Sequence, residues 1–130
     1  MSLRKLKSKR ISLYVLELSG EKYYVGQSRN PIQRINEHFA GEGSSWTRLH
    51  KPVGIVKIIN TNFSSWRAAL EMEALLTLEL MKIYGWKNVR GGPYSASDLA
   101  CEPRPLSQQR LRVEGVKAVS GPCRSESESQ

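Results

Sequence analysis

Two short apolar segments around a turn signal place the strongest constraint on what this chain can fold into. Residues 11–18 and 21–26 are rich in β-branched, aromatic and other apolar side chains, and a Ser-Gly dipeptide lies between them. This pattern is typical of a β-hairpin. Tyr14 lies in the first segment and Tyr24 in the second, so the register of the hairpin decides whether the two tyrosines share a face.

The next part of the chain predicts a short helix and a third strand. Asn30 is a suitable helix cap and Pro31 suits the first helical position, and apolar side chains recur at helical spacing up to residue 40. A loop dense in glycine, serine and polar residues follows over residues 41–52. The apolar run over residues 53–60 predicts a strand.

A long helix is expected over residues 66–84. This segment contains neither glycine nor proline, Ser64 or Ser65 can cap its start, and Gly85 can stop it. The residues from 86 to 95 are expected to be an irregular exit. The predicted order is therefore β-β-α-β-α, with no internal repeat.

Composition sets the outer limits. A chain of 130 residues supports one domain, which we predict over residues 11–95. Residues 1–10 carry five basic side chains and no acidic one, and this basic arm either follows a phosphate backbone or only keeps the chain soluble. Residues 96–130 are expected to be a polar tail, partly disordered. No signal peptide or membrane span is recognisable, so a cytoplasmic location is predicted.

Glu73 is the least expected residue of the long helix. At roughly 100° per residue it falls in the middle of the side that carries the apolar residues, with Thr77 beside it. A carboxylate that points into a protein is costly unless a cation, a metal or hydrogen-bond donors meet it. Two interpretations stay open, a buried ion pair with an arginine and a metal ligand at the floor of a cleft.

Arg34 and His38 lie one turn apart on the short helix, beside the apolar stripe of Ile32, Ile35 and Phe39. A guanidinium binds phosphate with two donors, and an imidazole can move a proton near neutral pH. Such a pair is more often an ordinary part of the surface. Tyrosines in a hairpin are likewise more often packing residues than catalysts.

Taken together, these residues resemble the GIY-YIG nuclease family. The order of motifs is Leu13-Tyr14-Val15, Tyr24-Val25-Gly26, Arg34, His38, Glu73 and Asn88, and it covers about residues 12–88. One departure is that Leu13 and Val15 replace the usual glycine and isoleucine of the first motif, while its tyrosine is retained. The resemblance implies an α+β sandwich with a central three-stranded antiparallel sheet flanked by helices. It also implies a metal-dependent DNA endonuclease.

The resemblance further implies a role for each motif residue. Tyr14 and Tyr24 would lie beside the scissile phosphate and orient or deprotonate the attacking water. Arg34 would stabilise charge on the phosphate, and Glu73 would hold one divalent cation, Mg²⁺ or Mn²⁺.

Three further motif positions complete the implied site. His38 is a candidate for proton transfer, and Asn88 would lie near the active site. Gly26 would let the backbone pass close to the substrate.

Substrate binding needs more than this site. The candidate DNA contacts outside the motifs are Lys22, Arg48, His50, Lys51, Lys87 and Arg90. Because this set is small, we expect help from a homo-oligomer or a separate DNA-targeting partner. Two alternatives stay open: a nucleic-acid-binding module of the same fold without cleavage activity, and a basic protein that binds a protein partner.

The nuclease interpretation predicts an odd-length hairpin loop. A strict two-residue turn at Ser19-Gly20 would send the two tyrosines to opposite faces. A three-residue loop over residues 18–20, with Gly20 in the left-handed conformation, would place Tyr14 directly opposite Tyr24.

Overall fold

The structure, a computed structural model, describes residues 10–106. The elements are β1 (Ser12–Leu18), β2 (Lys22–Ser28), α1 (Pro31–Phe39), α2 (Ser45–Leu49), β3 (Pro52–Asn60), α3 (Trp66–Tyr84), the 3-10 helix η2 (Trp86–Asn88) and β4 (Val89–Gly91). The predictions for residues 1–9 and for the tail beyond residue 106 lie outside the described residues. None of the helices within residues 10–106 is long and apolar enough to cross a membrane.

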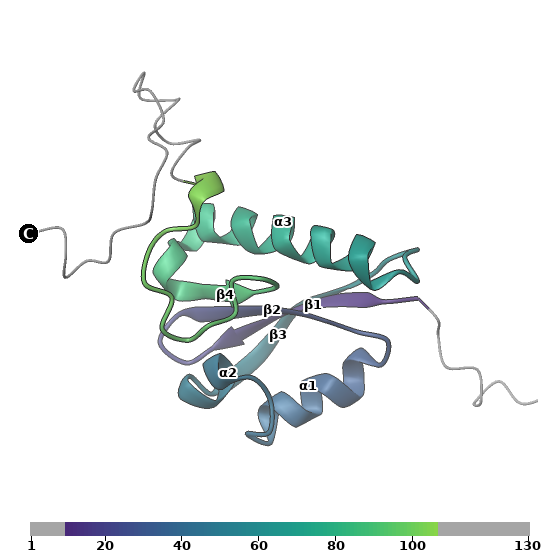
Figure 1. Cartoon of the computed structure of the whole chain (residues 1–130). Coiled ribbons are helices and arrows are strands. Elements are labelled where there is room, and N and C mark those ends of the chain that lie inside the picture. Colours follow the sequence, from purple (N-terminus) through teal and green to yellow (C-terminus); the bar gives the residue numbers. More distant parts are fainter. Residues whose placement is uncertain (1–9, 107–130) are drawn as a thin grey trace, which may run out of the picture.

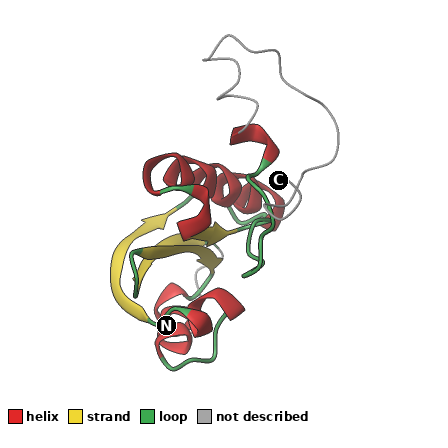
Figure 2. Cartoon of the chain, turned by 90° about the vertical axis from the view of Figure 1, so that its left-hand side faces the viewer, coloured by secondary structure: helices red, strands yellow, loops and turns green. Residues whose placement is uncertain are grey.

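The described elements form a mixed sheet between two layers of helix. Its strand order is β3-β1-β2-β4. The long helix α3 covers one face, and α1 and α2 cover the other (Figure 1). Figure 2, turned by 90°, shows the same arrangement with helices on both sides of the strands. The expected α+β sandwich is confirmed.

The predicted strand count was too low by one. The segment after α3, expected to be irregular, contains η2 and the short strand β4. β4 pairs in parallel with β2, whereas β1 pairs antiparallel with both β2 and β3. A strand of three residues leaves too short a pattern to be recognised in a sequence. The loop over residues 41–52 likewise contains the short helix α2, capped by the Ser44 side chain.

The hairpin loop has an odd number of residues, as predicted, but the two strands pair in a different register. Leu18 pairs with Lys22, so the loop is Ser19–Glu21, and Gly20 has a positive φ of 76°. Tyr14 pairs with Gly26 and Leu16 pairs with Tyr24. The tyrosines therefore share a face, as expected, but they lie diagonally and not directly opposite. The difference is one residue in the position of the loop, because Glu21 also adopts a positive φ, 59°.

Each face of the sheet carries its own core. Towards α1 and α2 the buried cluster consists of Tyr14, Leu16, Leu18, Tyr24, Ile35 and Trp46. Towards α3 it consists of Val15, Val25, Leu80, Met81, Val89 and Leu106. The alternation along β1 and β2 thus sends Tyr14 and Tyr24 to the face covered by α1 and α2.

The helices bury different residues from those their apolar patterns predicted. In α1 the buried side chains are Ile35 and His38, while Ile32 and Phe39 are exposed. His38 therefore belongs to the interior and not to the rim of an apolar stripe. The His38 ring can be buried because both of its nitrogens have hydrogen-bond partners in the interior.

In α3, Glu73 and Thr77 are buried as expected, whereas three large apolar side chains of the same helix, Trp66, Leu70 and Ile83, are exposed.

The segment after β4 also packs on the core. Leu106 is 7 % exposed and packs with Leu80 and Met81 of α3, and Leu99 contacts the same cluster. Figure 1 shows this segment returning to the end of α3. Packing against α3 thus continues past residue 95, since a polar composition does not exclude a few apolar side chains that pack on the core.

Candidate active site

Tyr14 and His38 form the centre of the site. Tyr14 lies on β1 and His38 in the last turn of α1, and the Tyr14 hydroxyl lies 2.7 Å from His38 Nε2. The second ring nitrogen, Nδ1, lies 3.0 Å from Thr47 Oγ1 on α2. All three side chains are buried. The imidazole is thus held between a strand and a second helix, with both nitrogens occupied.

Tyr24 completes an aromatic cluster with these two rings. Its ring centroid lies 5.0 Å from that of His38 and 6.3 Å from that of Tyr14. Burial raises the pKa of the Tyr14 phenol well above its usual value, helped by Tyr24, whereas Arg34 acts in the opposite direction. Burial and then the charge of Glu73 also raise the pKa of Tyr24. Both phenols are therefore protonated at neutral pH.

Gly26 makes room for the first of these tyrosines. A Cβ atom built on Gly26 would lie 2.3 Å from both Cζ and the hydroxyl oxygen of Tyr14. No side chain can occupy this space while the Tyr14 ring stays in place. The structure thus places Gly26 against a protein ring, whereas the resemblance implied a close approach to substrate.

Arg34 lies on α1 next to the two phenols. Its guanidinium Nη1 donates to Glu37 Oε1 at 2.8 Å, and this hydrogen bond is the first cause of the raised pKa of Arg34. The guanidinium also acts on Tyr14 and Tyr24, since its charge lowers the pKa of both. It is half-buried, so part of its donor set remains accessible.

Glu73 is held by uncharged donors. Its carboxylate accepts hydrogen bonds from Gln27 Nε2 at 2.7 Å and from the backbone N–H of Gly92 at 3.2 Å. Only 4 % of the residue is exposed, and burial raises the pKa of Glu73 to about 7 despite these two bonds. The donors differ from the arginine that the ion-pair interpretation required, so that interpretation was wrong.

The two faces of the sheet meet where β4 ends. β4 pairs with Tyr23, Tyr24 and Val25 of β2 and goes no further. Past Val25, the outer edge of β2 is approached instead by Glu73, which bonds Gln27 on β2 and Gly92 directly after β4. The Glu73 charge acts on both phenols from there. The phenols and Arg34 on one face, and Glu73 on the other, therefore surround the end of β2.

Asn88 ends η2, shortly after α3. Its side chain accepts from Lys22 Nζ at 2.8 Å and donates to the carbonyl of Tyr84 at 2.8 Å. Tyr84 ends α3 eleven residues after Glu73, which is about 16 Å along a helix axis. The hydrogen bonds of Asn88 thus link the start of β2 to the end of α3, and its place near the active site stays a prediction.

The candidate DNA contacts divide into exposed and buried side chains. Arg48, Lys51 and Lys87 are exposed, whereas Lys22 and His50 are half-buried. Burial lowers the pKa of His50, and the charges of Lys22 and Arg90 lower it further. The side chains of Lys22, His50 and Arg90 therefore lie near one another.

Arg90 corrects the list of DNA contacts. It is 4 % exposed and donates to the carbonyls of Trp86, Val89 and Ala96, with its guanidinium 4.3 Å from the Trp46 ring centroid. Because it is buried and three of its N–H groups donate to carbonyls of the fold, we leave it out of the proposed DNA contacts.

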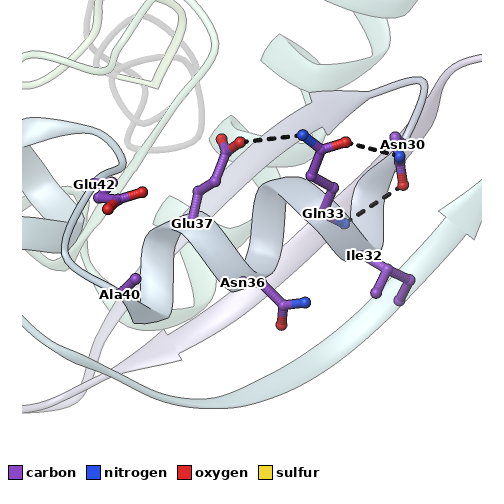
Figure 3. A pocket seen from close by; sticks show the side chains of 7 residues that line it. All are labelled: Asn30, Ile32, Gln33, Asn36, Glu37, Ala40 and Glu42. Atoms are coloured by element: carbon purple, nitrogen blue, oxygen red, sulfur yellow. Dashed lines mark hydrogen bonds between the residues drawn. The ribbon is translucent and has the colours of Figure 1, made fainter.

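A hollow on the outer side of α1 is a separate feature. Figure 3 shows Glu37 and Glu42 beside it, with Glu37 linked through Gln33 to Asn30. The cavity measures ≈ 470 Å³ and carries two carboxylates but no basic side chain. It does not suit a phosphate, and the motif tyrosines do not line it.

Three residues of the site were not anticipated from the sequence, namely Gln27, Thr47 and Gly92. Gln27 and Gly92 hold the Glu73 carboxylate, and Thr47 holds His38. Gln27 follows the second tyrosine motif directly, and that adjacency was the available signal. Thr47 and Gly92 reach the site only through α2 and β4, the two elements that the sequence did not reveal.

A divalent cation fits the oxygen atoms at Glu73. Within residues 10–106 no group of three or more His, Cys, Asp or Glu side chains could hold a metal. Beside the carboxylate, however, Gln27 Oε1 is buried without a hydrogen-bond partner. Leaving such an atom unpaired costs about 1–3 kcal/mol. One carboxylate and one amide oxygen suit Mg²⁺, which keeps several of its waters.

The described residues thus bring two tyrosines, an arginine and a single buried carboxylate to one strand end of a small mixed sheet. The model of the GIY-YIG catalytic domain matches residues 10–85. The chain belongs to the GIY-YIG nuclease family.

Curated relatives agree with this assignment. The chain is 39 % identical over 61 residues to a UPF0213 protein of Natronomonas pharaonis, which covers 47 % of this chain and 69 % of that protein. It is 31 % identical over 65 residues to a UPF0213 protein of Cupriavidus necator, covering 48 % and 71 %. A UPF0213 protein of Neisseria meningitidis is 43 % identical over 44 residues, covering 34 % and 48 %. No solved structure matches the chain at comparable significance.

Proposed function

We propose that this protein is a metal-dependent DNA endonuclease that hydrolyses phosphodiester bonds by in-line attack of water. The observation that supports this most strongly is the convergence of Tyr14, Tyr24, Arg34 and Glu73 at the end of β2, inside a GIY-YIG catalytic domain. These are groups that the reaction needs: phenols to orient the attacking water, an arginine to bind the phosphate and a carboxylate for a cation.

Tyr14 and Tyr24 bind and orient the attacking water. Both phenols are protonated at neutral pH, so neither is ready as a phenolate base. Tyr14 can accept a proton from water only while it gives up its own, and His38 Nε2 at 2.7 Å is the acceptor in contact. His38 is therefore assigned the proton transfer.

Arg34 binds the nonbridging oxygens of the phosphate through the donors that Glu37 does not use. Glu73, with Gln27 Oε1 beside it, would hold Mg²⁺ or Mn²⁺. When bound, that cation would neutralise charge on the phosphate and on the departing 3′ oxygen.

The DNA backbone would pass from the end of β2 towards the basic residues at its start. Lys22 lies four residues before Gly26, about 13 Å along the strand. The side chains proposed to contact phosphates there and on α2 are Lys22, Arg48, His50, Lys51 and Lys87. Because these phosphate contacts are few, a homo-oligomer or a targeting partner would add affinity for DNA. Cytoplasmic location stays a prediction.

A nucleic-acid-binding module without cleavage is the second candidate. The small basic surface around Lys22 and His50, which lies apart from the catalytic groups, is the observation that favours it. It predicts DNA binding in EDTA and no product with any divalent metal.

Nicking of supercoiled plasmid tests the proposal. With Mg²⁺ or Mn²⁺ we expect conversion to open-circular DNA, loss of conversion in EDTA, and a loss of about 100-fold or more in Glu73→Ala. Glu79→Ala, an exposed position on the same helix, is the control. Undiminished nicking by Glu73→Ala would overturn the proposal.

A further inference from the structure

A line of hydrogen bonds runs inward from the Tyr14 hydroxyl and ends on the backbone of α2. The hydroxyl lies 2.7 Å from His38 Nε2, His38 Nδ1 lies 3.0 Å from Thr47 Oγ1, and Thr47 Oγ1 donates to the carbonyl of Ser44 at 3.0 Å. Tyr14, His38 and Thr47 are each at most 1 % exposed. Partners inside the protein therefore decide where the protons of this line lie.

The α2 end of the line sets the proton on Nδ1. The Thr47 hydroxyl has one hydrogen, and the carbonyl oxygen of Ser44 can only accept. With that hydrogen committed, Thr47 Oγ1 faces His38 as an acceptor. Nδ1 must then carry a hydrogen to make the bond at 3.0 Å.

The Tyr14 end of the line agrees with this proton position. The guanidinium of Arg34, whose charge acts on the phenol, has only donors and so offers the phenol hydrogen no acceptor. The phenol hydrogen needs an acceptor of its own, and Nε2 at 2.7 Å provides one only if it carries no hydrogen.

The imidazole is neutral, so it carries one hydrogen and not two. Burial and then the charge of Arg34 lower the pKa of His38 to about 4, while Glu37 acts in the opposite direction. The other titratable groups that face the ring are the phenols of Tyr14 and Tyr24. Both phenols are neutral at pH 7, so neither adds a charge.

We propose that Thr47 is a positioning residue: it holds His38 in the tautomer with the hydrogen on Nδ1, and so leaves Nε2 open to receive the proton of Tyr14. Gly43 contributes to the same cradle, since a Cβ built there would lie 1.9 Å from Nδ1. The tautomer is a property of the protein alone. Its role in catalysis rests on the proposed nuclease function.

An O–H bond of the attacking water breaks and forms a new O–H bond on Tyr14, while the former Tyr14 hydrogen moves to Nε2. The hydroxide forms the bond to phosphorus, and the bond to the 3′ oxygen breaks with its electron pair on that oxygen, which solvent protonates. The imidazolium keeps its Nδ1–H on Thr47 and its Nε2–H on Tyr14, and later returns its extra proton to solvent.

Nitrogen NMR of the imidazoles reads the tautomer without DNA or metal. The chain has two histidines, and the variant His50→Gln identifies the signals of His38. We expect Nδ1 to resonate as a protonated nitrogen and Nε2 as an unprotonated one in the native chain and in Thr47→Ser. In Thr47→Val, which keeps the volume but lacks the acceptor, the two signals should move towards each other as the tautomers mix.

Single-turnover cleavage measures the consequence. Thr47→Val should lower the rate by about 10- to 100-fold, as expected for a group that orients a catalytic residue, and Thr47→Ser should restore most of it. Thr61→Val makes the same change at another buried threonine that bonds only the backbone, and it should keep the native rate.

The two measurements separate the possible failures. An Nε2–H tautomer in the native chain would overturn the assignment, even if Thr47→Val failed to fold. A native cleavage rate in folded Thr47→Val would also overturn the role. If the Nδ1–H tautomer were found in a chain that cleaves no DNA with any metal, the nuclease function would fail while the tautomer assignment held.

Discussion

Glu73 combines a structural cost with a chemical use. Its side chain is buried between Gln27 and Gly92, two uncharged partners, and within residues 10–106 it has no ion pair with a basic side chain. In the metal-free protein the carboxyl is therefore poised between its two protonation states near neutral pH. A cation bound there would favour the ionised form, so metal binding and folding stability are coupled at this residue.

The pH dependence of stability tests this coupling. The pKa of Glu73 rises from 4.5 in the unfolded chain to about 7 in the fold, so its contribution is fully present below pH 4.5 and is lost as the pH rises through 7. In EDTA, the unfolding free energy of the native chain should fall by about 3 kcal/mol through this group as the pH rises from below 4.5 to well above 7. Glu73→Gln should lack this loss and be the more stable protein at pH 9 in urea titrations.

Glu79 provides the comparison for that experiment. It lies on the same helix with a largely exposed side chain, so Glu79→Gln should follow the native pH profile. Parallel profiles for the native chain and Glu73→Gln would show that the Glu73 carboxyl is not destabilised when it ionises.

Gly26 offers a second test at the residue scale. Alanine there would force the buried Tyr14 ring to move, because its Cβ would lie 2.3 Å from the ring. We expect a loss of about 1–3 kcal/mol in unfolding free energy and a broken contact between Tyr14 and His38. Gly54→Ala, with no atom within 4 Å of the added Cβ, is the control. Equal stability of the two variants in thermal denaturation would contradict the packing role.

At the scale of residues, part of the candidate site could be predicted from the sequence. Tyr14, Tyr24, Arg34 and Glu73 could be predicted because they stand in ordered motifs on elements with strong local patterns. The surroundings of His38 could not be predicted, since its partner Thr47 lies on a short helix inside a loop. The hydrogen bonds of Asn88 to Lys22 and Tyr84 could not be predicted either, because they depend on how η2 follows the end of α3.

At the scale of elements, the hairpin shows what a sequence can and cannot decide. An odd number of loop residues was predicted from the requirement that both tyrosines lie on one face. The loop in the structure also has an odd number of residues. The choice between a loop at residues 18–20 and one at 19–21 depends on whether Glu21 adopts a positive φ, which is uncommon for glutamate. Tyr14 therefore meets Gly26, and the absence of a side chain there admits its ring.

Two other elements depended on tertiary contacts. β4 is short and forms only against the edge of β2. α2 relies on its Ser44 cap and on Trp46, whose indole nitrogen donates to the Tyr23 carbonyl at 2.9 Å. Local periodicity cannot reveal segments this short, because their stability comes from what they pack against.

The segment after β4 carries its own prediction. Leu106→Ala should lower the unfolding free energy by about 2–3 kcal/mol, because Leu106 is buried against Leu80 and Met81. Leu75→Ala, at a position 67 % exposed on α3, should change it by less than about 0.5 kcal/mol. Urea unfolding of both variants measures the difference. Equal changes in unfolding free energy for the two variants would show that Leu106 does not stabilise the core.

At the scale of the whole molecule, the sheet separates two kinds of chemistry. The proposed proton transfer lies on the face of α1 and α2, whereas the carboxylate proposed to hold the cation comes from α3. The two meet where β4 ends and leaves the edge of β2 open. This division predicts that DNA binding and the chemical step can be separated by substitutions, because the basic residues near Lys22 and His50 lie at the other end of the strand.

The most direct test of the nuclease proposal is a single-turnover measurement on DNA already bound. The protein is first saturated with a labelled duplex or branched DNA in a metal-free solution, and cleavage is then started with excess Mg²⁺ or Mn²⁺. We expect metal-dependent strand cleavage by the native chain. Glu73→Gln should bind the DNA with little change in affinity and cleave it at least about 100-fold more slowly. A Glu73→Gln rate equal to the native rate, or bound DNA that no metal causes the native chain to cleave, would contradict the account.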